Sequence, residues 1–142
     1  YYAGKAAQEE AYAAGPVPLT LAHTTAWFSL AETFLSQIRI GPVAVVPGLR
    51  LQPVHPCAAA EFVADAVESG PASGSPPRVE VRQLAGSEVM DAAAMARAVA
   101  SARHPGVRVV RLPLPMSGPR EGLLPEAHGS TDPRTFDDWL TS

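Results

Sequence analysis

The chain has a single cysteine, Cys57, so it forms no internal disulfide and contains no CxxC motif for a metal or a redox pair. No apolar run approaches the roughly 20 residues that cross a membrane, and no signal-peptide pattern opens the sequence. The 11 basic residues are scattered, without the runs or stripes that bind nucleic acid. These absences predict a cytoplasmic protein with no direct nucleic-acid partner and no membrane contact.

The glycine-rich turns that grip a dinucleotide, GxGxxG and GxxGxxG, are also absent. The 11 glycines and 15 prolines instead gather between periodic segments, which is typical of turns and loops in a folded chain. Hydrophobic residues make up 46% of the sequence and charged residues 18%, values typical of globular proteins. We therefore interpret residues 1–142 as a single folded unit.

The hydrophobic periodicity predicts helices that alternate with strands. Expected helices cover 2–14, 27–38, 57–69 and 89–102, with a short one after Thr135; expected strands or extended pieces cover 18–23, 43–46, 49–54, 79–84 and 107–112. Ser87 is expected to cap the fourth helix, and Glu80 and Arg82 are expected to face solvent. The alternation predicts an α/β fold with a parallel sheet and right-handed crossovers.

Segment 18–23, with the sequence PLTLAH, is typical of an inner strand, yet we expect it to have no neighbour within this chain. Parallel sheets are normally wider and covered on both faces. The chain is therefore interpreted as the C-terminal part of a Rossmann-like, doubly wound parallel sheet, incomplete because its N-terminal strands lie upstream of Tyr1. An open apolar edge predicts self-association or pairing with the missing N-terminal half.

Four stretches resemble, in order, segments of the NmrA-like group of atypical short-chain dehydrogenase/reductases. The opening YYAGKAAQEE with GPVPLTL resembles its YxxxK-xxxE and GxPxTxLR stretch. QPVH at 52–55, LAGSE at 84–88 and TFDDWL at 135–140 resemble its QPV, LAGPE and TFxxWL segments. The sequence departs from the family at His23, which replaces an arginine, and at Cys57 and Ala58, which replace acidic residues.

The resemblance implies that this chain is the C-terminal, substrate-side portion of an NAD(P)-dependent oxidoreductase. Such an enzyme would act on a small carbonyl or quinone-like acceptor. Tyr1 would be the proton donor, and Lys5, one helical turn later, would favour its ionised form and hold the cofactor ribose. The resemblance implies cofactor contacts from Lys5, His23, Thr24 and Thr25, and substrate contacts from Trp27 and Phe28.

Simpler interpretations remain open for the same residues. Thr24 or Thr25 would serve equally well as a helix cap, and Trp27 and Phe28 as ordinary core residues. His55 and Cys57 alone make no metal site, because such a site needs three or four converging ligands. NAD(P) is expected to bind the full-length parent, and this chain alone is expected to be inactive. The alternatives are a non-catalytic NmrA-like protein that senses a dinucleotide for a regulatory partner, or a truncated chain without independent activity.

Overall fold

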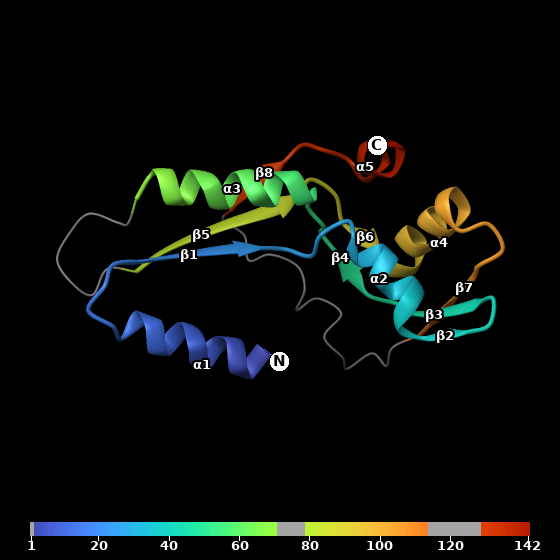
Figure 1. Cartoon of the computed structure of the whole chain (residues 1–142), viewed down its shortest axis with the longest axis horizontal. Coiled ribbons are helices and arrows are strands. Elements are labelled where there is room, and N and C mark those ends of the chain that lie inside the picture. The colour runs from blue at the N-terminus through green and yellow to red at the C-terminus, as the bar shows by residue number, and fades with distance from the viewer. Residues whose placement is uncertain (1, 71–78, 114–128) are drawn as a thin grey trace.

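The computed structural model describes residues 2–70, 79–113 and 129–142, which form a mixed α/β fold (Figure 1). Its elements in chain order are α1 (Tyr2–Ala13), β1 (Leu19–Thr24), α2 (Leu30–Gln37), β2 (Arg39–Ile40), β3 (Val43–Pro47), β4 (Arg50–Leu51), α3 (Pro56–Glu68), β5 (Val79–Gly86), β6 (Met90–Asp91), α4 (Ala92–Arg103), β7 (Arg108–Leu112), β8 (Ser130–Asp132) and α5 (Phe136–Thr141). The expected alternation of helices and strands is confirmed.

One sheet is wholly parallel, with strand order β1-β5-β8. Strand β1 pairs with β5 over six positions, from Leu19 opposite Val79 to Thr24 opposite Leu84. The expectation that β1 has no neighbour in this chain is therefore wrong. Its neighbour is 60 residues further along the chain, across a long crossover, so local sequence gave no sign of the pairing. Helices α1 and α3 lie on either side of this sheet in Figure 1.

A second sheet, of order β2-β3-β7, carries the main core. Strands β3 and β7 run parallel, whereas β2 is antiparallel to β3. Helices α2 and α4 pack together on one face of this sheet. The buried face of α4 is rich in alanine, and its small side chains let the helix approach its neighbours closely. A two-stranded antiparallel pair, β4 with β6, completes the strand pairing of the described residues.

An aromatic cluster fastens the C-terminal helix α5 to the core. The Phe28 ring lies 5.5 Å from that of Phe136 and 6.1 Å from that of Trp139, centre to centre. Thr135 caps α5 as expected: its hydroxyl accepts from the backbone N–H of Asp138, and the Asp138 carboxylate accepts from the N–H of Thr135. This reciprocal capping box stabilises α5, which has only six residues and would not be stable as an isolated helix.

Two helix starts differ from the sequence expectation. Helix α2 begins at Leu30 rather than near Trp27, because Trp27 bridges to Val54 and the next N–H donates to the Val54 carbonyl. Helix α4 begins at Ala92, and its cap is Asp91 rather than Ser87, since the Asp91 carboxylate accepts from the third residue of the helix at 3.1 Å. Strand β6 lies between Ser87 and the first residue of α4.

Strand β5 is half-buried, but its exposed face is not the expected one. Val81 is 54% exposed, whereas Glu80 and Arg82 are half-buried and form an ion pair at 2.6 Å. The alternation of the segment is therefore correct and the assignment of its faces is wrong. Within the ranges the structure describes, no helix combines the length and apolar character needed to cross a membrane.

Candidate functional site at the carboxyl ends of the parallel strands

The carboxyl ends of the three parallel strands meet at one edge of the sheet. Thr24 ends β1, Gly86 ends β5, and Asp132 ends β8, directly opposite Gly86. In open α/β sheets, ligands bind outside this edge, because the loops that follow the strands converge there. Thr24 at the end of β1, and Thr25 and Trp27 just after it, were predicted to face cofactor and substrate. They lie at this end of the sheet.

A chain of hydrogen bonds joins three segments here. The Thr25 hydroxyl donates to the backbone carbonyl of Gln52 at 2.5 Å, and the Gln52 side-chain amide donates to the Gly86 carbonyl at 2.8 Å. Gly86 admits no side chain, because a Cβ there would lie 1.8 Å from the carbonyl oxygen of Pro53. Thr25 therefore has a structural partner, and its hydroxyl fixes the loop after β1 against the segment after β4.

A pocket of about 320 Å³ opens beside this loop. It is lined by Thr25, Ala26, Trp27, Ser29, Leu30 and Thr33. Trp27 is 48% exposed, and its indole N–H donates to the Thr24 hydroxyl at 3.0 Å, which fixes the ring at the pocket wall. Hydroxyls and one aromatic face suit a small, uncharged ligand with a polar atom. No lining side chain titrates near neutral pH, so proton transfer would need a group from elsewhere.

His23, predicted to contact the cofactor, instead contacts helix α1. Its Nε2 atom lies 3.2 Å from a carboxylate oxygen of Glu9, and both side chains are 40% exposed. Lys5 lies one turn before Glu9 on the same helix, and the N-terminal end of α1 points toward the carboxyl end of β1 in Figure 1. Tyr1, the predicted proton donor, lies outside the described residues.

Phe28, predicted to contact substrate, lies in the core rather than on the pocket wall. It is 2% exposed and packs against Phe136, Trp139 and the edge of the His55 ring. The structure thus separates two adjacent aromatic residues: Trp27 faces the pocket and Phe28 faces the core.

The sequence analysis missed a polar cluster beside the ends of β5 and β8. Asp132 is 6% exposed, and one of its carboxylate oxygens lies 3.9 Å from Nε of Arg134. Arg134 also donates to Glu61 of α3 at 2.7 Å, and this hydrogen bond raises the pKa of Arg134 above its ordinary value. Among the described atoms, Asp132 Oδ2 and Arg134 Nη1 are buried without a hydrogen-bond partner. The sequence gives no signal for this cluster, because Glu61 of α3 is more than 70 residues away in the chain from Asp132 of β8 and from Arg134 in the loop after it.

His55 and Cys57 have a local structural role at the start of α3. The His55 Nδ1 atom accepts from the backbone N–H of Cys57 at 3.1 Å and so caps the helix, while the thiol of Cys57 is exposed. In the part of the chain that the structure describes, no three His, Cys, Asp or Glu residues gather as metal ligands do.

Comparison with known proteins adds no family to this geometry. A scan against models of protein families, a search of curated proteins and a search of solved structures each found no match.

Proposed function

We propose that this chain is the substrate-side, C-terminal portion of an NmrA-like, NAD(P)-dependent short-chain dehydrogenase/reductase. The parent enzyme, placed in the cytoplasm, would reduce a small carbonyl or quinone-like acceptor. The observation that carries the proposal is the pocket at the carboxyl end of β1, walled by Trp27 and by hydroxyl side chains. A carbonyl oxygen can accept hydrogen bonds from the hydroxyls of Ser29 and Thr33, while the rest of the molecule stacks on the indole ring.

The proposal assigns only the nicotinamide end of the dinucleotide to the described residues. Thr24 and Thr25 lie where the nicotinamide end would be expected, but their hydroxyls are engaged with Trp27 and Gln52. No glycine-rich turn follows any described strand, so nothing there cradles a diphosphate. The proposal accordingly assigns the NAD(P)-binding site to a missing N-terminal half of the parent. It assigns the acceptor pocket to this chain.

Tyr1 and Lys5 complete the proposed chemistry. Because α1 runs antiparallel to β1, its first turns lie toward the end of the sheet that carries the pocket (Figure 1). The proposed proton donor, Tyr1, directly precedes α1 and lies outside the described residues. A lysine one turn later would favour the ionised form of the tyrosine.

The second candidate is a non-catalytic sensor of the same family. Two observations favour it: none of the pocket-lining side chains is titratable, and His23 is paired with Glu9 instead of facing the pocket. A sensor would bind the acceptor-like ligand without turning it over, so binding alone does not separate the two functions. Turnover by a parent that retains its nucleotide-binding half, and its loss when Tyr1 is replaced by Phe, would favour the enzyme.

The first test is a pair of titrations of the purified chain. An aromatic ketone, followed by titration calorimetry, is expected to bind saturably and to lose its binding in Trp27→Ala. The buried Trp139→Phe serves as the matched control, because Trp139 is 9% exposed and lies outside the pocket. NADPH and NADH, followed by nicotinamide fluorescence, are expected not to bind tightly. Ketone binding that is indifferent to Trp27 would contradict the pocket assignment, and saturable dinucleotide binding would contradict the fragment assignment.

A further inference from the structure

Strand β7 lies at one edge of the second sheet and, within the described ranges, pairs only with β3. Its Arg108 donates to the residue just before β3 at 2.7 Å, and its Leu112 accepts from the residue just after β3 at 2.9 Å. In a parallel ladder, alternate residues turn their backbone groups toward the same neighbour. The N–H and C=O groups of Val109 and Arg111 therefore point away from β3, toward an edge that no described strand pairs with.

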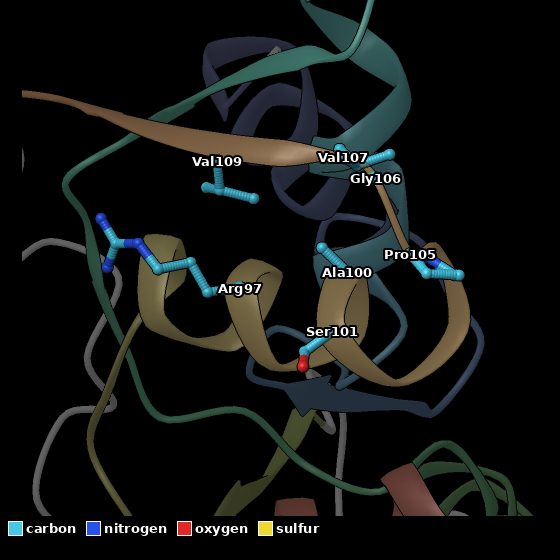
Figure 2. Close-up of a pocket in the computed structure, with 7 residues that line it drawn as sticks. All are labelled: Arg97, Ala100, Ser101, Pro105, Gly106, Val107 and Val109. Carbon is cyan, nitrogen blue, oxygen red and sulfur yellow. The ribbon is translucent and has the colours of Figure 1, made fainter.

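A pocket of about 360 Å³ lies beside this edge, between β7 and helix α4 (Figure 2). It is lined by Arg97, Ala100, Ser101, Pro105, Gly106, Val107 and Val109. In Figure 2, the Val109 side chain hangs from β7 toward α4, and Arg97 extends along the same side. Together, the outward backbone groups and this pocket form what we call the β7 groove.

The β7 groove is flanked by positive charge. Arg97 is exposed on the helix side of the strand, and Arg108 is exposed on the opposite side. The described residues supply neither with an ion-pair partner, whereas Arg111 pairs with Asp91 at 3.1 Å. A strand added to this edge would therefore meet unpaired cations on both of its faces.

This charge decides between two occupants of the edge. A second copy of the chain, paired through its own β7, would bring another Arg97 and another Arg108 to the same interface. Like charges brought together across paired strands are destabilising. An extended segment with acidic side chains places opposite charges there instead, and so it fits the edge better.

We propose that the β7 groove binds an extended acidic segment of a partner protein by strand addition. The backbone of the segment bonds to the outward N–H and C=O groups of Val109 and Arg111. An aliphatic side chain enters the pocket over Val109, and a carboxylate reaches Arg97. In this mode of recognition the main chain supplies affinity, and the pocket and the charges supply specificity.

The test uses the full chain and a fluorescein-labelled synthetic peptide of alternating glutamate and valine, roughly seven residues long to match a strand. Two matched probes replace every glutamate by lysine or N-methylate alternate backbone nitrogens. Fluorescence anisotropy is expected to show saturable binding of the glutamate peptide, about tenfold tighter than either matched probe and weaker at about 0.5 M salt. Equal binding of the three peptides, or no binding of the glutamate peptide, would overturn the proposal.

Two variants locate the binding on the molecule. Val109→Pro removes one outward N–H while leaving every hydrogen bond to β3 in place, and it is expected to weaken the glutamate peptide about tenfold. Arg97→Glu is expected to reverse the preference toward the lysine peptide, and Arg39→Glu, on the opposite edge strand β2, is expected to leave it unchanged.

A thermal melt checks that each variant is folded, and Arg97→Glu decides the question even if the proline is not tolerated, because Arg97 is exposed. An unchanged preference in Arg97→Glu would refute the acidic partner. Sedimentation that shows a dimer of the unmodified chain, lost in Val109→Pro, would assign the edge to a second copy and would overturn the proposal.

Discussion

Replacing Gly86 by alanine tests the packing at the functional edge of the parallel sheet. Gly86 ends β5, and its α-carbon faces the backbone of Pro53. A Cβ at this position would lie 1.8 Å from the Pro53 carbonyl oxygen and 2.7 Å from the carbonyl carbon, well inside the 3.0 Å that real Cβ contacts respect. Because both partners are backbone, no side-chain rotation relieves the overlap, so the two segments must move apart.

The cost follows from two contributions. Forcing an extra carbon into a packed site costs about 1–3 kcal/mol. The separation also weakens the hydrogen bond from the Gln52 amide to the Gly86 carbonyl, now 2.8 Å long, which is worth about 1 kcal/mol. We expect Gly86→Ala to lower the free energy of unfolding by about 3 kcal/mol, a large part of the roughly 5–15 kcal/mol typical of a domain.

Urea unfolding followed by circular dichroism measures this change. The matched control is Gly4→Ala in α1, where a Cβ meets nothing within 4 Å. That substitution is expected to leave stability unchanged or to raise it by about 0.5–1 kcal/mol, because alanine favours helix. If Gly86→Ala unfolds at the same urea concentration as the unmodified chain, the close approach of β5 to Pro53 is not present in solution. The described contact between the end of β5 and the segment after β4 would then be wrong.

Two further substitutions separate core, cap and pocket. Phe28→Ala is expected to lower the free energy of unfolding in urea by about 3–5 kcal/mol, because it leaves a cavity in the core. Ketone affinity, measured at a temperature where the variant is folded, is expected to stay unchanged. A selective loss of ketone affinity would show that Phe28 contacts the ligand in the pocket. Thr135→Ala is expected to cost about 1 kcal/mol at neutral pH through loss of the helix cap. The hydroxyl and the backbone N–H of Thr135 donate to the Asp138 carboxylate and hold its pKa below the ordinary value of 3.8. The part of the stabilisation that comes from these bonds is therefore present above 3.8 and is lost as the pH falls through the lower pKa of the folded chain. The difference in stability between the unmodified chain and Thr135→Ala should therefore shrink in acid, and a difference independent of pH would count against the capping box.

Local pattern predicted most of the elements. The helix near 57–69, the alternation of 79–84 and the cap at Thr135 all depend on neighbours within a few residues, and the structure shows each of them. The apolar face expected for that helix is only partly correct, because Ala59 and Ala66 are buried whereas Val63 and Val67 are exposed. Strand β8 was not predicted, because three residues in a segment rich in proline and glycine carry no periodicity. Its pairing with the end of β5 is set by the tertiary fold.

The faces of the elements were harder to predict than their presence. Val81 was expected on the covered face of β5, yet Arg82 lies on the more buried side, where it pairs with Glu80 and lies near Asp65 of α3. Which face is covered depends on where a crossover helix lands, and alternation alone is symmetric in that respect. Trp27 and Phe28 illustrate the same limit, because these neighbouring residues in the segment before α2 point in different directions.

The position of the candidate site could be predicted from the sequence, but the hydrogen bonds within it could not. That the loop holding Thr25 would lie at a functional edge followed from its position after a parallel strand. That Thr25 would bond to Gln52, 27 residues away, and Gln52 to Gly86, 34 residues further on, could not be deduced from spacing. Gln52 and Gly86 belong to two of the segments that resemble the family, whereas Thr25 lies outside them. A chain of hydrogen bonds joins the loop after β1, the segment after β4 and the end of β5 beside the pocket. These bonds explain why Gly86→Ala, a change outside the pocket lining, is expected to loosen the loop that holds Trp27.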